Sequence, residues 1–346
     1  MIPAREPRTP RDAARLLVLD PEGGTFEDTL MPELPRFLRP GDLLVVNDAA
    51  TLPASLRART ASGVEAEIRL LGQIENSTWK AAVFGPGDWR TPTELRDPPE
   101  RVTPGSVLSV GESLAMEVVE VSPDSPRLIT VRFDRSGEDL WTALYAFGKP
   151  IQYSYLSKDL ALWSVQTVYA ARPWAVEMPS AGEALSWRIL LALRRKGVRL
   201  AYLTHAAGLS ATGDEDLDAL LPLAERFEIP GSTVEAIEAT HVFGGRVVAV
   251  GTTVVRALEG CAAQHSGKLI EGAGMTGLVI TKDFSPRVVD GLLTGIHEPS
   301  QSHFRLLRAF TDETSLRRAW RHAAEIGYLG HEFGDACLIL REGPEK

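Results

Sequence analysis

The sequence predicts an α/β protein in which helices pack on a largely buried sheet and an all-β domain is inserted into the chain. Two short apolar runs near the N-terminus are typical of buried strands. Between about residues 56 and 133 the helical period disappears, whereas helices and strands alternate after residue 150. We therefore assign residues 1–55 and 150–346 to an α/β main domain and residues 56–149 to the insertion.

The first strands of the main domain are predicted at residues 16–19 and 43–46. The second run is apolar at every position, which is typical of a strand covered on both faces. It follows a turn at residues 39–42 and ends in the polar pair Asn47-Asp48. The strands of the insertion expose one face to water, and a strand this apolar would not fit among them. We therefore assign it to the main sheet.

The insertion is predicted from strand periodicity. Apolar residues at positions 64, 66, 68 and 70 alternate with charged residues, as in a strand with one face in water. Turn signals rich in Gly, Pro and Asp separate the runs that follow, and this spacing is typical of a small barrel or sandwich. Further strands are predicted at residues 80–84, 107–110, 116–121 and 128–133.

Helices return after the insertion. A helix at residues 138–147 is followed by Gly148, which we expect in the left-handed conformation that ends many helices. The pattern from Ser232 to Glu235 is a capping box and predicts the start of another helix. The remaining predicted elements are a helix at 183–196 closed by Gly197, strands at 198–203 and 246–250, and a helix at 254–264.

Composition excludes several classes of protein. Of 346 residues, 46 are acidic and 37 basic, and the net charge of −9 argues against a wholesale nucleic-acid coat or a membrane-surface binder, although a local basic face stays possible. Two cysteines, Cys261 and Cys337, form neither a disulfide framework nor a zinc ribbon. Without a signal peptide or a membrane-spanning run, we expect a cytoplasmic protein, a monomer rather than an obligate oligomer, with no metal.

The candidate site residues follow from one rule about α/β sheets. Ligands gather beyond the carboxyl ends of strands, where loops converge and helix N-termini expose unpaired N–H groups. Applied to the predicted strands, the rule selects residues at or after several strand ends and in the loops near them. These residues are Asn47, Asp48, His205, Gly251, Thr252, Thr253, Asp290 and His297, together with Gly182 at the head of a predicted helix.

Each candidate also has a purely structural interpretation. Asn47-Asp48 suits a cap or turn, and a lone histidine such as His205 is more often structural than catalytic. Thr252 and Thr253 suit a helix start without a ligand, and His297 suits an ordinary turn. Only their common location in the predicted topology favours a site.

Two further sequence patterns match known functional motifs, but we interpret both first as structural features. Residues 272–277 match G-x-G-x-x-G, but residues 278–281 after them are predicted to form a strand rather than the helix that a dinucleotide site requires, so we interpret the glycines as a flexible connection. A basic cluster at helical spacing is interpreted first as a solvated helix face, with contact to RNA phosphates as the alternative. It comprises Arg305, Arg308, Arg317, Arg318 and Arg321.

Taken together, these segments resemble one known family, the S-adenosylmethionine:tRNA ribosyltransferase-isomerases of queuosine biosynthesis. The resemblance runs in order over nearly the whole chain, and it implies a barrel-like α/β main domain with an inserted β-barrel. The segments include LRPGDLLVVND at residues 38–48, QTVYA at 166–170, MPSAG at 178–182, GGRVVAVGTTVVRALE at 244–259, VVDGLLT at 288–294, HEP at 297–299 and GDA at 334–336.

The chain departs from the family pattern at polar positions. Ala49 and Ala50 stand where the family has Thr and Arg, and Glu183-Ala184 stands where it has Leu-His. Two family histidines are leucines in residues 220–225, of which Glu225 is the acidic survivor, and a family lysine is Ser300. Frame residues persist while polar ones are replaced, which indicates altered substrate handling.

The resemblance implies that the ribosyl part of S-adenosylmethionine is transferred to 7-aminomethyl-7-deazaguanine in tRNA and isomerised to give epoxyqueuosine. S-adenosylmethionine is then a consumed substrate, no cofactor is needed, and the implied partners are S-adenosylmethionine and tRNA. By position in the motifs, His205, Asp48 and His297 are the candidate catalytic residues. The candidate substrate-binding residues are Asn47, Ser180, Gly182, Glu225, Gly251, Thr252, Thr253, Arg256, Asp290 and Asp335.

Two functional classes stay open from the sequence. The chain is an enzyme of this family with a reshaped site, or it is a divergent paralogue that binds S-adenosylmethionine or another nucleoside without making epoxyqueuosine. An ordinary methyltransferase is disfavoured, because no glycine-rich loop joins a first strand to a helix.

Overall fold

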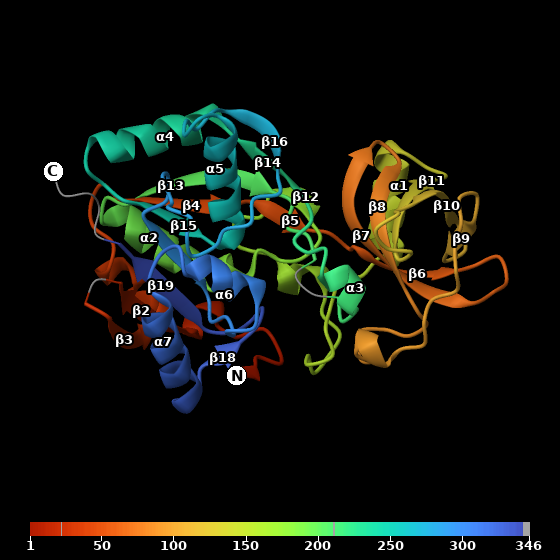
Figure 1. The fold of residues 1–346 in the computed structure, drawn as a ribbon, viewed down its shortest axis with the longest axis horizontal. Coiled ribbons are helices and arrows are strands. Elements are labelled where there is room, and N and C mark those ends of the chain that lie inside the picture. The colour runs from red at the N-terminus through yellow and green to blue at the C-terminus, as the bar shows by residue number, and fades with distance from the viewer. Residues whose placement is uncertain (22, 210–211, 342–346) are drawn as a thin grey trace.

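The computed structural model describes residues 1–21, 23–209 and 212–341, and a mixed nine-stranded sheet forms its larger part (Figure 1). In the described residues this sheet stays open, with β16 and β3 at its two edges. Its strand order is β16 (Gly272–Thr276), β14 (Glu225–Ile229), β13 (Arg199–His205), β4 (Leu43–Asn47), β15 (Val247–Val250), β17 (Gly291–Gly295), β19 (Ala336–Leu340), β2 (Arg15–Asp20) and β3 (Thr25–Leu30).

The centre of the sheet is parallel and buried on both faces. Strands β13, β4, β15 and β17 run parallel to one another, so their carboxyl ends meet at one edge. Alternate residues of β4 enter different cores: Leu43 and Val45 pack with α4 (Gly231–Val242) and α5 (Thr252–Gln264), whereas Leu44 and Val46 pack on the side of α2 (Trp187–Arg195). This is why the run has no polar position, as the sequence predicts.

The inserted barrel is confirmed as a closed structure of six strands. Around the barrel their order is β10 (Leu114–Val121), β11 (Leu128–Phe133), β8 (Thr78–Phe84), β7 (Glu65–Glu75), β6 (Ser55–Arg59) and β9 (Val107–Val110), and every pairing is antiparallel. Helix α1 (Gly137–Phe147) contributes Leu140 and Leu144 to the barrel core. In Figure 1 the barrel and α1 stand beside the α/β body, to its right. The exact domain limits, residues 1–55 and 150–346 for the main domain and 56–149 for the insertion, stay a prediction.

The two bodies are joined by chain segments that lie close together. Strand β5 (Ala49–Thr51) leads from the end of β4 to the barrel and pairs in parallel with β12 (Arg172–Ala175). On the barrel side, Ser55 and Lys149 exchange two backbone hydrogen bonds of 2.9 Å each. The chain therefore enters and leaves the barrel at one place.

Helix α1 ends at Phe147 as predicted, but three predicted details at helix ends are wrong. Gly148 is extended (φ −80°) rather than left-handed; it is glycine because a Cβ there would lie 2.2 Å from the carbonyl oxygen of Pro53. The helix expected at residues 183–196 begins at Trp187, and Ser186 caps it by accepting a hydrogen bond from the N–H of Ile189. Ser232 does not cap α4, which begins at Gly231 after Pro230.

The glycine-rich segment at residues 272–277 is also not a flexible connection. Residues 272–276 form β16, which pairs with β14 and is an edge of the large sheet, and residues 278–281 are not a strand. Gly274 lies against the ring of Phe227, where a Cβ would come within 2.5 Å of it. No helix follows these glycines directly, so the dinucleotide interpretation stays rejected.

Within the described residues, no helix combines the length and the apolar character that crossing a membrane requires.

Candidate functional site

The carboxyl edge of the parallel strands brings together most of the predicted site residues, and Asn47 is their centre. Asn47 is buried at the end of β4 and bonds to its neighbour strand twice: its side-chain amide donates to the carbonyl of His205 at 2.9 Å, and its carbonyl oxygen accepts from the N–H of His205 at 2.9 Å. Its amide also lies 3.5 Å from Oγ1 of Thr253. Asn47 therefore fixes the ends of β4 and β13 against the start of α5.

His205 points into the interior and is fully buried (0% exposed). Neither ring nitrogen has a hydrogen-bond partner among the described residues, although Nε2 lies 3.4 Å from Oε2 of Glu225. Burial, helped by the positive charge of Arg256, lowers the pKa of His205 to about 3. The imidazole is therefore neutral at ordinary pH.

Glu225 and Arg256 form a buried ion pair beside this histidine. Oε2 of Glu225 is bound by Nη1 of Arg256, and its Oε1 accepts from the N–H of Gly208 at 2.7 Å. The guanidinium also donates from Nε to the carbonyl of Leu278 at 3.2 Å, while its Nη2 is buried with no partner among the described residues. Burial raises the pKa of Glu225, and the charge of Arg256 opposes this shift.

Two histidines stand near Arg256. His297 follows β17 and stacks on His303 of α6 (Ser302–Leu307), with ring centroids 4.8 Å apart, and its Nε2 lies 2.9 Å from Oγ1 of Thr294. Burial, and then the charge of Arg256, lowers the pKa of His303 to about 4. Burial and His303 lower the pKa of His297. His303 was not predicted from the sequence.

The start of α5 lies between these groups. Gly251 precedes the helix with φ +91°, a left-handed value that favours glycine, and Thr252 and Thr253 are the first helical residues. No side chain caps this end, so its N–H groups are available to an anionic group.

Ser180 and Gly182 belong to a short 3₁₀ turn, η5 (Ser180–Gly182), that packs against the same edge. A Cβ added to Gly251 would lie 3.3 Å from Cβ of Ala181. Gly182 itself is pressed against a buried tyrosine, since a Cβ there would lie 1.9 Å from the hydroxyl of Tyr169. This turn therefore lies near the start of α5, while a role of Ser180 and Gly182 in substrate binding stays a prediction.

Replacing Gly182 by alanine is therefore expected to destabilise the protein by about 1–3 kcal/mol, because Tyr169 is buried and its hydroxyl cannot move away freely. Urea unfolding measures this loss. The loss should shrink in a Tyr169→Phe background, which lacks the clashing oxygen. Gly277→Ala is the control, since that Cβ would meet no atom within 4 Å. An equal loss in both backgrounds would contradict the steric explanation.

Asp48 lies at the outer side of the site. Its Oδ1 accepts a 2.6 Å hydrogen bond from the hydroxyl of Thr204, and its backbone carbonyl accepts from the N–H groups of Ala171 and Arg172. Burial raises the pKa of Asp48, and the hydrogen bond from Thr204 and the charge of Arg172 oppose this. Asp48 is next to Asn47 in the chain, but its carboxylate is bound to Thr204 rather than to the side chains around His205.

The structure does not bring Asp290 to this site. Asp290 precedes β17 and accepts a 2.8 Å bond from the N–H of Val247, the first residue of β15, so it lies at the opposite, amino edge of the strands. Its second partner there is His241, at 3.2 Å. Its role is structural: it ties the starts of two parallel strands to the end of α4.

Asp335 lies at the carboxyl edge of the parallel strands, where the candidate site is, but its role is structural. It precedes β19, whose first residue pairs with Gly295 at the carboxyl end of β17. Its carboxylate accepts from the N–H groups of Arg15 and Leu329, at 2.8 Å each, and from the guanidinium of Arg8 at 2.6 Å. Both oxygens are therefore occupied.

The sequence analysis did not select Glu183 as a titratable residue of the site region. It stands directly after η5, is 4% exposed, and burial raises its pKa to about 7, although Arg11 and Arg8 oppose the shift. The sequence feature that could have identified it is a glutamate at a position where the family resemblance implies leucine.

The raised pKa of Glu183 predicts a pH-dependent stability. Between pH 4.5 and about 7 the folded state holds a proton that the unfolded state releases, so this residue destabilises the fold progressively as the pH rises, by about 3 kcal/mol in all. Glu183→Gln should therefore gain stability relative to the wild type over this window in urea titrations. Glu117→Gln, at an exposed position, should not. A pH-independent difference for Glu183→Gln would contradict the assignment.

The fold and this site define a class of protein: an α/β protein with an inserted barrel and a cluster of buried polar side chains at its strand ends. The chain belongs to the family of queuosine biosynthesis proteins, whose family model matches residues 1–339.

Similar proteins agree with this membership. The S-adenosylmethionine:tRNA ribosyltransferase-isomerase of Thermosynechococcus vestitus is 34% identical over 344 residues, which cover 97% of this chain and 92% of that protein. The protein of the same name from Thermus thermophilus is 36% identical and the alignment covers 97% of this chain and 95% of that protein. A crystal structure of S-adenosylmethionine tRNA ribosyltransferase from Thermotoga maritima is 28% identical, with a TM-score of 0.53, covering 98% of this chain and 96% of that one.

Proposed function

We propose that this protein transfers the ribosyl part of S-adenosylmethionine to 7-aminomethyl-7-deazaguanine in tRNA and isomerises it, yielding epoxyqueuosine, adenine and methionine. Support comes from the family membership and from the names of relatives that match almost the whole chain. In this proposal S-adenosylmethionine is consumed as a substrate and no cofactor takes part. A cytoplasmic, monomeric state stays a prediction.

One observation carries the proposal: three buried polar atoms lack a partner at the strand ends, within the residues that the structure describes. They are both ring nitrogens of His205 and Nη2 of Arg256, and they flank the carboxylate of Glu225. Buried polar groups are almost always hydrogen-bonded, so a cluster of unpaired ones indicates a place for a polar ligand. The uncapped start of α5 lies beside it, bound to Asn47 through Thr253.

These groups suit the chemistry of a sulfonium substrate. A sulfonium acidifies the neighbouring C–H bonds, so a positioned base can start the reaction. His205 is the candidate for this step, and Glu225 stands 3.4 Å away, where it would stabilise the imidazolium that forms. The N–H groups of α5 and Nη2 of Arg256 would hold the methionine carboxylate.

A second candidate function is favoured by the same histidine. With a pKa of about 3, His205 in this structure is a weak proton acceptor, and Ala49 and Ala50 stand where the family resemblance implies threonine and arginine. The protein would then bind S-adenosylmethionine or another nucleoside at this site without making epoxyqueuosine.

The test is to incubate the protein with S-adenosylmethionine and tRNA carrying 7-aminomethyl-7-deazaguanine, and to analyse the digested tRNA by mass spectrometry. Epoxyqueuosine that depends on both substrates, with release of adenine and methionine, supports the enzyme. Binding of S-adenosylmethionine in calorimetry with no product supports the second function. The absence of both binding and product contradicts both.

A further inference from the structure

A cavity of about 320 Å³ lies where the barrel meets the chain segment that leaves it. Its walls come from β6, from the loop after β8 and from residues 147–159. The volume lies within the range of small-ligand sites. Trp89 and Phe147 provide apolar surface, and charged side chains from both sides complete the lining.

One of the lining carboxylates is neutralised within the wall. Glu67 is held by the guanidinium groups of Arg69 and Arg96, both of whose side chains are only 2% exposed. Burial alone would raise the pKa of Glu67, but the charges of these arginines outweigh it and lower the pKa to about 2. Glu67 therefore adds no free negative charge to the cavity.

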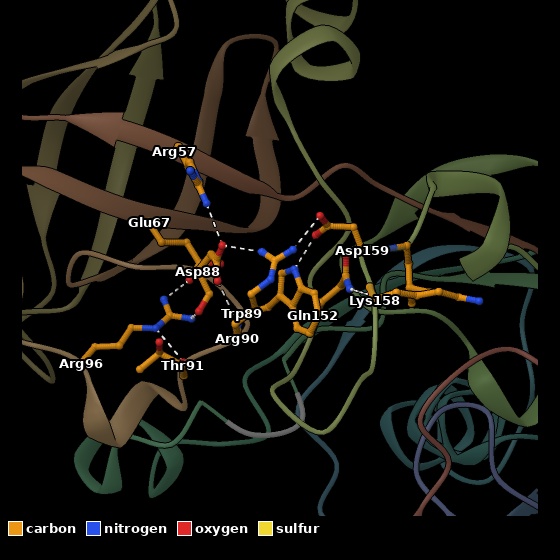
Figure 2. A network of polar contacts seen from close by, with 11 residues as sticks. Arg57, Glu67, Asp88, Trp89, Arg90, Thr91, Arg96, Gln152, Lys158 and Asp159 are labelled. Carbon is orange, nitrogen blue, oxygen red and sulfur yellow. Dashed lines mark hydrogen bonds and ion pairs between the residues drawn. The ribbon is translucent and has the colours of Figure 1, made fainter.

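The charges that remain leave one cation in excess. Asp88 binds both Arg57 at 2.8 Å and Arg90 at 2.7 Å, and Asp159 binds Arg90 at 2.8 Å and the indole N–H of Trp89 at 2.7 Å (Figure 2). Lys149 forms no ion pair within 4 Å with any carboxylate in the described part of the chain, although its charge helps to lower the pKa of Asp159. Three cations thus face two carboxylates in a protein whose net charge is −9.

The cavity is close to the candidate site along the chain. Asp48 of the site follows β4, β5 comes next, and Ser55 lines the cavity, so six residues lie between Asp48 and Ser55. A chain of this length spans at most about 25 Å. A polynucleotide held at the strand ends can reach the cavity with a nearby nucleotide, which a free small molecule cannot do.

We propose that this cavity binds a nucleotide of the RNA substrate outside the reacting base, with a phosphate on Lys149 and Arg57 and the sugar or base against Trp89 and Phe147. Lys149 provides the uncompensated charge that attracts the phosphate, and the side chain of Arg57, 72% exposed, lies at the mouth of the cavity. The inference rests on the proposed function for the identity of the ligand as RNA.

The test measures binding of an unmodified tRNA transcript by fluorescence anisotropy at several salt concentrations. Each phosphate contact contributes about 0.7–0.9 to the slope of log affinity against log salt. Lys149→Ala and Arg57→Ala should therefore each reduce this slope by about that amount and weaken binding about five- to eightfold at 0.1 M salt.

Arg59→Ala is the matched control. Arg59 lies two residues from Arg57 on the same barrel strand and is similarly exposed, but it pairs with Glu65 and does not line the cavity. It should bind tRNA within about twofold of the wild type. Lys149 keeps its backbone bonds to Ser55 as alanine, and thermal unfolding checks that the variants remain folded.

Three results would overturn the inference. The first is Lys149→Ala and Arg57→Ala binding tRNA as tightly as Arg59→Ala. The second is loss of S-adenosylmethionine binding in Lys149→Ala, which would assign the cavity to that substrate. The third is tight, Lys149-dependent binding of guanosine monophosphate with unchanged tRNA affinity, which would indicate a free nucleotide. Lys149-dependent tRNA binding by a protein that makes no product would contradict only the proposed function.

Discussion

Replacing Glu225 by alanine is expected to lower the free energy of unfolding by about 3–5 kcal/mol, one of the two largest effects that the structure predicts. Arg256 would keep its charge in the interior with only the carbonyl of Leu278 as a partner among the described residues. Removing one member of a buried ion pair leaves the other uncompensated, and this costs far more than the pair contributes. Urea or guanidinium unfolding at pH 7 measures the change.

Two controls separate this explanation from a general effect of losing a carboxylate. Glu117→Ala breaks the exposed pair with Arg132 and should cost at most about 1 kcal/mol. Replacing both buried partners, Glu225→Leu with Arg256→Met, should restore most of the stability, because no unpaired charge remains. A loss below about 1 kcal/mol for Glu225→Ala would contradict the buried pair.

The second large effect concerns catalysis. In the proposed ribosyl transfer, His205→Ala should lower kcat/KM by about a hundredfold or more, the usual contribution of a positioned acid or base. The imidazole is buried, both its nitrogens are free of partners in the described part of the protein, and it lies 3.4 Å from Glu225. His322→Ala on α7 (Glu313–Glu325), where the histidine pairs with Asp28, should leave turnover unchanged. A change below tenfold for His205→Ala would remove His205 from this role.

The low pKa of His205 also determines the pH dependence. Since it is about 3, the imidazole stays neutral from pH 5 to 9, and protonation near pH 6.5 plays no part. The pH–rate profiles of the wild type and of His205→Ala should then have the same shape over this range and differ only in height. An acid limb near pH 6.5 that vanishes in the variant would show that the histidine is accessible to water during turnover.

Most predicted strands lie close to observed ones, although residues 278–281 form none, whereas the starts of α2 and α4 were missed. Strand limits in the barrel follow from alternating polarity, and the predicted runs 107–110 and 128–133 coincide with β9 and β11. Helix starts depend on competing caps: Ser232 and Glu235 match a capping box, but the helix begins two residues earlier, after Pro230. Local sequence patterns cannot decide between two such start signals, because the packing around the helix determines which one is used.

The glycines of β16 show a different limit. Their spacing suggested a loop, yet Gly274 is required because the ring of Phe227 occupies the space of a side chain. The two residues are far apart in the sequence, and the glycine segment itself contains no signal that an aromatic ring packs against it. Long-range packing of this kind is visible only in the fold.

The candidate site was predictable where its residues end parallel strands. Asn47 and His205 meet because β4 and β13 are neighbours, as the strand-end rule requires. Asp290 precedes its strand, so the same rule should have placed it at the other edge. The pairing of Glu225 with Arg256 needed knowledge that β14 turns back beside β13, which no periodicity reveals.

The double backbone bond between Ser55 and Lys149 marks where the barrel could be excised from the chain. The ends of the excised piece are as close as two adjacent strands, about 5 Å apart. A short glycine linker could close the remaining chain once the apolar residues that faced the barrel, such as Leu52 and Ile151, were made polar. Excision would also expose Val176 and Leu209, which pack in the barrel core from the main body, so these positions would need polar residues too.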